Sequence, residues 1–236
     1  MRVIGLLGGL SWESTVTYYA AINRGVRDAL GGLHSAKIVM HSFDFAEIAA
    51  LQTEAGWPEA SRRLADAAKN LEAAGAECIL ICSNLMHKTA PVVEHAINVP
   101  LFHIADGLGA ALKAKGRAKP LLLATGPVME ETFYSDRLRD KFGIDAMVPD
   151  NDDRAMVHRV IFDELVRGIV SDESKRTYLG VIDKAIKAGA DSVIFGCTEI
   201  GLLLQPEDVP LPVFDTAVLH AEIAIKFALD GNYGLA

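Results

Sequence analysis

The sequence is poor in cysteine, and the cysteines it has suit neither a disulfide framework nor a metal site. The chain has three cysteines, Cys78, Cys82 and Cys197, an odd number whose spacing matches no disulfide framework. This indicates free thiols in a reducing compartment. Cys78, Cys82 and His87 fall on an expected strand and the helix after it, without the short paired spacing of a zinc site. We therefore expect no bound metal.

Basic charge and long apolar runs are also lacking. The formal net charge is -8 and no run of Lys or Arg occurs, so nucleic acid is not an expected partner. The longest apolar runs, such as 120–124, are of strand length, far short of the roughly 20 residues that a membrane-spanning helix needs. Met1-Arg2 leads directly into the strand-like segment 3–7 with no leader pattern. These absences predict a cytoplasmic protein without a membrane segment.

Cofactor signatures are missing as well. The sequence has no glycine-rich dinucleotide fingerprint and no phosphate loop, so neither a dinucleotide nor ATP is indicated. No lysine motif suggests pyridoxal phosphate, although a lone Schiff-base lysine leaves no pattern by which it could be recognised. We expect a protein that works without a cofactor.

What the chain does contain is a regular alternation of short and long apolar segments. Half of its 236 residues are hydrophobic, which is enough for a substantial core. Short runs rich in Val, Ile and Leu alternate with longer segments of helical period, a pattern typical of a parallel sheet covered by helices. The expected strands span residues 2–7, 37–42, 78–82, 98–103 and 119–124. A first helix is expected to follow the first strand and to end at Ala29, and further helices are expected at 58–74, 107–115, 155–168 and 216–229. The polar stretch 149–154 is expected to be an exposed loop that caps the helix 155–168.

The chain also contains an internal repeat. Residues 75–84 match residues 189–198 position for position, and two weaker pairs, 9–19 with 126–134 and 99–102 with 212–215, share nearly the same offset of 112 to 117 residues. A near-constant offset indicates duplication. We therefore predict an α/β fold made of two similar domains with parallel sheets, related by a pseudo-twofold axis.

The domain boundaries follow from this repeat. The first domain is expected to comprise residues 1–103 plus 215–236, with the last helix packing back on the first half, and the second to comprise residues 104–214.

The repeat places Ser83 and Cys197 at equivalent strand ends. Ligands of open α/β sheets bind at the carboxyl ends of the strands, so the two side chains are expected to flank one cleft. A thiol and a hydroxyl on opposite walls suit removal of a proton from one face of a carbon and its return to the other, which is racemisation. Backbone amides can bring a thiol pKa near neutrality, which makes Cys197 a reasonable base, whereas a serine hydroxyl needs activation.

Some of these residues have a structural interpretation beside the functional one. A cysteine after an apolar strand is more often a small buried hydrophobe, and we assign Cys78 and Cys82 to that role. For Cys197 the Gly-Cys-Thr-Glu context and the repeat favour chemistry. Gly8-Gly9 either binds a ligand carboxylate or only makes a tight strand-to-helix turn. For His87, a hydrogen bond to a neighbouring loop is favoured over a role as a ligand.

At 83–87 and 196–199 the sequence resembles the aspartate/glutamate racemase family, the cofactor-independent amino acid racemases. The likeness continues through 4–15, 32–36, 41–45, 102–106 and 212–216, and so covers essentially the whole chain. The resemblance implies two α/β domains with the active site between them, a homodimer, and a small amino acid substrate. It is greatest to the branch that contains broad-specificity enzymes acting on aspartate and glutamate.

The motif after the first repeated strand departs from the family's pattern. The usual motif is Cys-Asn-Thr, or Thr-Asn-Thr in one branch, and here it is Ser83-Asn84-Leu85. Ser83 therefore resembles the hydroxyl-bearing branch, while Leu85 replaces a threonine that in the family helps to hold the substrate's polar head. The resemblance implies that Ser83 and Cys197 are catalytic. It also implies that the substrate-binding site is lined by Leu10, Gln52, Asn84, Leu85, Glu164, Thr198 and Glu199.

These residues have physical roles that suit an amino acid. Backbone amides near 83–85 and 198–199 can hold the α-carboxylate. Glu199 can accept the ammonium, and Gln52 can donate to a side-chain carboxylate without imposing a full charge. For Gln52 and Glu164 the alternative is a solvated surface position.

Two other functions fit the same residues. One is decarboxylation or isomerisation of a small dicarboxylate, for which one cysteine is enough. The other is a catalytically silent protein that binds carboxylates.

Overall fold

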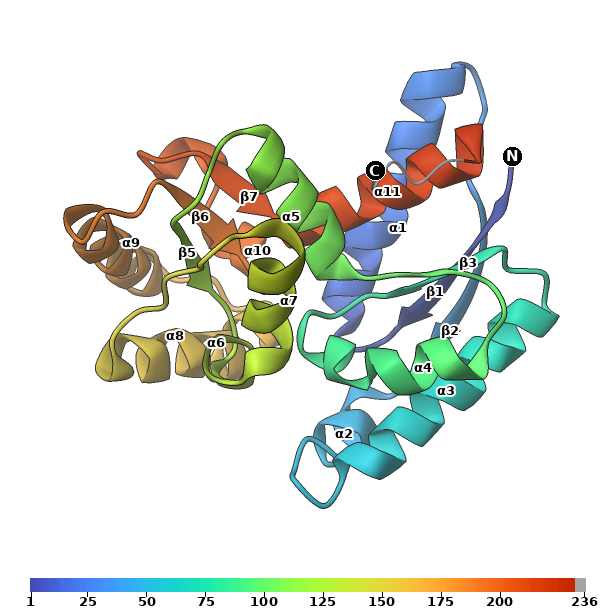
Figure 1. Cartoon of the computed structure of the whole chain (residues 1–236), viewed down its shortest axis with the longest axis horizontal. Helices are drawn as coiled ribbons and strands as arrows, with labels where there is room; N and C mark the ends of the chain where they lie inside the picture. The colour runs from blue at the N-terminus through green and yellow to red at the C-terminus, as the bar shows by residue number, and fades with distance from the viewer. Residues whose placement is uncertain (232–236) are drawn as a thin grey trace. The chain divides into compact units, whose positions relative to one another are not determined.

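The computed structural model of the chain describes residues 1–231 and divides into two compact units (Figure 1). Unit 1 consists of Met1–Ile104 together with the chain from His220 onward, and unit 2 consists of Ala105–Leu219. Strands and helices alternate along both units, and all named strand pairs are parallel. The predicted α/β fold with two parallel sheets is confirmed.

Unit 1 is built on a four-stranded sheet of order β2-β1-β3-β4. Its strands are β1 (Val3–Gly8), β2 (Lys37–Ser42), β3 (Cys78–Ile81) and β4 (Leu101–Phe102). Every residue of β3 is buried, whereas the edge strand β2 has only exposed and half-buried residues. The continuous apolar run of β3 reflects burial of both faces of a central parallel strand.

Helices cover both faces of this sheet. The helical segments of the first part of unit 1 are α1 (Trp12–Leu30), α2 (Phe45–Ala49), α3 (Trp57–Ala73), η1 (Leu85–Thr89), α4 (Ala90–Ala96) and the start of α5 (Ile104–Ala114). In Figure 1, α3 and α4 lie together on one side of the strands and α1 lies on the other. The largest side chains of the α3 face, including Leu64 and Leu71, pack with Leu7, Ile79 and Ile81 of the sheet in one apolar cluster.

The last helix, α11 (Thr216–Asp230), belongs to unit 1 from His220 onward. The backbone N–H of Arg2 donates to the Ala228 carbonyl over 2.9 Å, and the Arg2 guanidinium lies 4.6 Å from the centre of the Phe227 ring. The same ring packs edge-on against Phe102 of β4, with ring centres 5.1 Å apart.

Unit 2 repeats the plan with a three-stranded sheet of order β5-β6-β7. The strands are β5 (Pro120–Leu123), β6 (Ser192–Phe195) and β7 (Val213–Asp215). Its helical segments are α6 (Gly126–Glu130), α7 (Thr132–Phe142), α8 (Asn151–Asp163), η2 (Leu165–Arg167), α9 (Asp172–Lys187), α10 (Ile200–Leu203) and η3 (Pro206–Asp208). Nowhere in residues 1–231 is a helix long and apolar enough to cross a membrane.

One helix start was wrongly predicted. The stretch 149–154 was expected to be a loop before a helix at 155–168, but α8 begins at Asn151, and the Asp150 carboxylate caps it by accepting the N–H of Asp153 over 3.0 Å. Acidic side chains are favoured in the first turn of a helix because they face its unpaired N–H groups. The polar stretch is therefore the cap and first turn of α8.

The duplication is visible in the backbone. Gly75 and Gly189 both have φ of 94°, a left-handed conformation that favours glycine. The residue after each glycine closes the preceding helix in the same way: Ala76 N–H donates to Leu71 O over 3.0 Å, and Ala190 N–H donates to Ala185 O over 2.9 Å. The predicted repeat therefore extends to individual hydrogen bonds.

Candidate active site

In unit 1 the candidate residues lie where β3 ends, beside the end of β1. The Cys82 N–H donates to Leu7 O over 3.0 Å, so the two strand ends are adjacent. Ser83 follows half-buried, with its N–H bonded to Ile81 O at 2.8 Å and its Oγ accepting the Met86 N–H at 3.5 Å. Asn84 and Leu85 are buried at the start of η1.

Leu10 and Gln52 are brought to the same loop. Leu10 belongs to the apolar cluster that contains Met86, and the Gln52 Nε2 donates to the Met86 Sδ over 3.7 Å. Gln52 is half-buried, so it does not occupy the solvated surface position that was its alternative. Unit 1 thus gathers a hydroxyl, two amides and two apolar side chains at one end of its sheet.

The Gly8-Gly9 turn has a structural explanation. The Gly9 N–H donates to Thr15 Oγ1 over 2.8 Å, and φ of Gly9 is 70°. A Cβ at Gly9 would lie 2.2 Å from the Phe43 carbonyl oxygen, so the two segments approach too closely for any side chain. The tight-turn interpretation therefore accounts for Gly9, whose amide already has an acceptor.

In unit 2 the candidate residues follow β6. The Cys197 Sγ donates to Glu199 Oε2 over 2.9 Å, and the Thr198 Oγ1 donates to the same oxygen over 2.8 Å. All three residues are buried, with Glu199 only 4 % exposed. The buried Glu199 carboxylate therefore accepts hydrogen bonds from both the Cys197 thiol and the Thr198 hydroxyl.

The protonation state of Cys197 differs from the prediction. Burial raises the pKa of the Cys197 thiol well above its usual value, the Glu199 carboxylate raises it further, and the Glu199 backbone N–H lowers it by less. Backbone amides therefore do not bring this pKa near neutrality, contrary to expectation, because burial and the Glu199 carboxylate outweigh them. A neighbouring negative charge disfavours a thiolate, and the sequence could not show that the Glu199 side chain turns toward the sulfur.

Glu164 is held by hydroxyls near the start of α9. Its Oε2 accepts hydrogen bonds from Ser174 Oγ at 2.7 Å and from Ser171 Oγ at 3.2 Å. Burial raises the pKa of Tyr178 well above its usual value, and the charge of Glu164 raises it further. Glu164 therefore lies within electrostatic range of this buried tyrosine.

Two residues beside Cys197 were not identified from the sequence. Thr125 follows β5, the neighbour of β6, and its buried Oγ1 has no hydrogen-bond partner within the part of the chain that the structure describes. Asp215 ends β7 on the other side of β6, where burial raises its carboxyl pKa. Both lie at strand ends, where ligands of open parallel sheets bind, so the same rule applied to β5 and β7 could have identified them.

The other two thiols are structural, as predicted. Cys78 and Cys82 are fully buried in and after β3. Burial raises the pKa of Cys78 to about 12, and it raises that of Cys82 as well. Among the described residues, no three His, Cys, Asp or Glu side chains come together in a way that could hold a metal ion.

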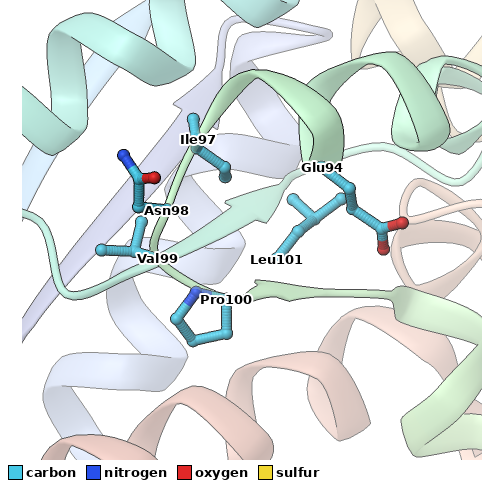
Figure 2. Close-up of a pocket in the computed structure, with 6 residues that line it drawn as sticks. All are labelled: Glu94, Ile97, Asn98, Val99, Pro100 and Leu101. Carbon is cyan, nitrogen blue, oxygen red and sulfur yellow. The ribbon is translucent and has the colours of Figure 1, made fainter.

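A surface hollow of about 490 Å³ lies elsewhere in unit 1. Figure 2 shows the side chains that line it, which come from the end of α4 and the turn into β4: Glu94, Ile97, Asn98, Val99, Pro100 and Leu101. This turn enters β4 at its amino end, whereas Ser83 follows the carboxyl end of β3. Because ligands of open parallel sheets bind at carboxyl ends, the hollow is not the candidate active site.

Comparison with known proteins identifies relatives of the whole chain. The model of the Asp/Glu/Hydantoin racemase family matches residues 7–224. A Yersinia pestis protein classed with the Asp/Glu racemases is 47 % identical, with a TM-score of 0.91 over 98 % of this chain and 100 % of that one. An aspartate racemase homologue from Pyrococcus horikoshii OT3 is 32 % identical, with a TM-score of 0.84 over 97 % and 99 % of the two chains. The broad specificity amino-acid racemase RacX of Bacillus subtilis is 18 % identical over 175 residues, which are 71 % of this chain and 72 % of RacX.

Proposed function

The chain belongs to the Asp/Glu/Hydantoin racemase family, and from this premise we propose that it is an amino acid racemase that needs no pyridoxal phosphate. As a member of that family it is an isomerase. We assign Cys197 and Ser83 as the two groups that remove and return the Cα proton, on opposite faces of one substrate. This assignment is supported by their equivalent places at the ends of β6 and β3.

The observation that carries the proposal is the contact between Cys197 and Glu199. The thiol lies 2.9 Å from a buried carboxylate, so the charge of that carboxylate acts directly on the sulfur, and the thiol proton is released to solvent when the substrate ammonium pairs with Glu199. A substrate ammonium placed against Glu199 would cancel the charge that now raises the Cys197 pKa. Substrate binding would thereby favour the thiolate at the moment when a base is needed.

The proton transfers then balance in a simple way. The thiolate takes the Cα proton and becomes a thiol, while backbone amides at the strand ends stabilise the charge that develops on the carboxylate. Ser83 supplies a proton to the other face, and in the reverse direction it must be deprotonated to act as the base. Because a serine hydroxyl is a weak acid and a weak base, the two directions are expected to differ in the rate of their first step.

The substrate class we propose is acidic or broad. Gln52 offers a neutral amide to a substrate side chain, and the buried Leu85 adds an apolar contact where a polar residue is usual. Neither residue demands a particular charge on the side chain. The broad specificity of RacX supports the same inference.

We also propose that the protein is a homodimer. Trp12, Val16 and Tyr19 are 65 %, 55 % and 53 % exposed on one face of α1, since residues three and four apart share a face. Three adjacent apolar side chains of this size suit an interface between protein surfaces.

The test is incubation with L- and D-aspartate, L- and D-glutamate and a panel of neutral amino acids in heavy water. Cα deuteration is followed by NMR, and product configuration by chiral chromatography. Deuteration with inversion, abolished by Cys197→Ser, is the expected result.

Other outcomes are equally informative. Release of carbon dioxide without inversion would replace the proposal with a decarboxylase. Thermal stabilisation by aspartate without any deuteration would leave only a binding protein, because a ligand bound to the folded state alone raises its stability.

A further inference from the structure

His87 is a buried histidine with two backbone partners. It lies on η1, four residues after Ser83, and is 2 % exposed. Its Nδ1 is 2.7 Å from the Ser83 carbonyl oxygen, and its Nε2 accepts the Ile104 N–H over 3.1 Å. The predicted hydrogen bond to a neighbouring loop is confirmed, and a second bond holds Ser83 itself.

These two partners fix the tautomer of the ring. A backbone N–H can only donate, so Nε2 must carry a lone pair, and a carbonyl oxygen can only accept, so Nδ1 must carry the proton. His87 is therefore neutral, with Nδ1–H donating to Ser83 O. A charged imidazolium would lose the bond from Ile104.

The His87 ring supplies a hydrogen bond to the Ser83 carbonyl that the backbone does not supply. In an α-helix the Ser83 carbonyl would accept the N–H of residue 87, but η1 is a tighter helix and the His87 N–H bonds Asn84 O at 3.1 Å instead. The side chain of His87 takes the place of that missing bond. The Ser83 hydroxyl itself is held within the loop by a long contact to the Met86 N–H, 3.5 Å, so its position depends on the backbone that carries it.

His87 is in turn held by a second histidine. Its ring centre lies 5.5 Å from that of His220, whose Nε2 is 2.7 Å from Phe102 O and whose Nδ1 is 2.8 Å from the Tyr18 hydroxyl. The ring centre of His103 is 4.5 Å from that of His87. Aromatic packing and fixed backbone partners thus leave the His87 ring one orientation.

We propose that His87 is a positioning residue for Ser83, acting as the Nδ1–H tautomer that holds the Ser83 carbonyl against the start of α5. This inference rests on the proposed racemase function for its kinetic consequence, though not for its geometry. It assigns His87 no contact with the substrate and no proton transfer.

Two substitutions separate the two bonds of the ring. In His87→Asn the side-chain amide lies near the Nδ1 position and can still donate to Ser83 O. In His87→Gln the amide oxygen reaches the Nε2 position and can still accept from Ile104, but the donor to Ser83 is lost. His95→Gln, on the exposed face of α4, is the control.

The kinetic measurement is solvent deuterium in the recovered, uninverted enantiomer, which reports the base on each face separately. His87→Gln is expected to slow the slower of the two exchanges, the one assigned to Ser83, by about tenfold relative to the other, the effect of one ordinary hydrogen bond. His87→Asn is expected to change this ratio much less. Equal slowing of both exchanges by both variants indicates a merely structural role and overturns the proposal.

A second measurement does not depend on turnover. Amide hydrogen exchange of Met86, whose N–H meets Ser83 Oγ, is expected to accelerate in His87→Gln and to stay near wild type in His87→Asn and His95→Gln. Imidazole nitrogen NMR is expected to show the Nδ1–H tautomer in the wild type. An Nε2–H tautomer, or unchanged Met86 amide exchange in His87→Gln, overturns the proposal for His87. Absence of deuteration in every amino acid would refute the racemase function instead, and it would leave these two measurements of His87 valid.

Discussion

Cys197 and Glu199 form the pair of side chains on which the proposed chemistry depends. The thiol is buried and hydrogen-bonded to a carboxylate, so it rests in the protonated form. Because the thiol must lose its proton before it can act as a base, and the charge of Glu199 opposes that loss, the pair can be tested by changing either member.

Replacing the thiol is the simplest test. Cys197→Ser is expected to lower turnover by about 10²- to 10⁴-fold, the usual contribution of a positioned general base, in a racemisation assay at saturating substrate. Cys78→Ala removes a thiol that lies within β3 and is expected to retain turnover. Full activity of Cys197→Ser would refute its assignment as the base.

Replacing the carboxylate separates its two effects. Glu199→Gln removes the negative charge that raises the Cys197 pKa, so that pKa is expected to fall, as measured by the ultraviolet absorbance of the thiolate against pH with Cys197→Ser as the blank. Turnover is expected to fall as well, because the substrate ammonium loses its acceptor. A thiolate that forms at the same pH in both proteins would contradict the contact.

At the scale of the element, the turns after α3 and α9 show why the repeat could be recognised from sequence. Gly75 and Gly189 hold the same φ of 94°, and the strands that follow them carry the same buried pattern. Local rules of this kind are visible in a sequence because one residue type satisfies them. The start of α8 was missed because acidic residues suit both loops and helix caps.

The glycine after α9 offers a controlled stability test. Gly189→Ala forces a side chain into a left-handed conformation and is expected to destabilise unit 2 by about 1–2 kcal/mol. Gly180→Ala lies within α9 with open space around it and is expected to stabilise by about 0.5–1 kcal/mol. Urea unfolding of both variants measures the difference, and equal effects would show that backbone conformation is not the cause.

The ion cluster between α5 and α7 predicts a dependence on pH. Burial raises the pKa of Asp106, but bonds from Arg137 (2.6 and 2.8 Å) and Lys141 (2.6 Å) outweigh burial and hold that pKa below its usual value. Stability from a lowered carboxyl pKa is present above about pH 4, where an unfolded aspartate is ionised, and is lost as pH falls through the lower folded-state value.

Asp106→Asn is accordingly expected to lower the free energy of unfolding by about 1–3 kcal/mol near neutral pH. The loss is expected toward the lower end of this range because Arg137 and Lys141 are both partly exposed. The difference from wild type should shrink below about pH 4. Asp136→Asn, which breaks an exposed pair with Arg139, is the control and should change stability by less than about 0.5 kcal/mol. Equal losses in the two variants would contradict the role of burial.

At the scale of the molecule, the sequence predicted the fold class and the strand ends, but not the contacts between side chains. Ser83 and Cys197 were found from their equivalent places in a repeat, which is a property of the chain. The Glu199 carboxylate turns toward the two residues before it, and the His87 ring joins Ser83 to Ile104, but these contacts depend on side-chain orientations that residue types do not specify. Such contacts leave no periodic signal.

The proposed dimer is tested with one substitution on α1. Val16→Glu places a charge at the centre of the face formed with Trp12 and Tyr19 and is expected to convert a dimer into a monomer in light scattering after size-exclusion chromatography. Leu33→Glu, at a fully exposed turn, should remain dimeric. A wild-type monomer would refute the proposal directly.

The path of the chain through the two units has a consequence for biosynthesis. Unit 1 needs the segment from His220 onward, since Arg2 bonds Ala228 and Phe102 packs on Phe227, yet residues 105–219 are made in between. At ordinary rates of translation this separates the two parts of unit 1 by on the order of 10 s. During that interval the ribosome displays an N-terminal sheet without its closing helix, while the continuous unit 2 can complete its own fold first.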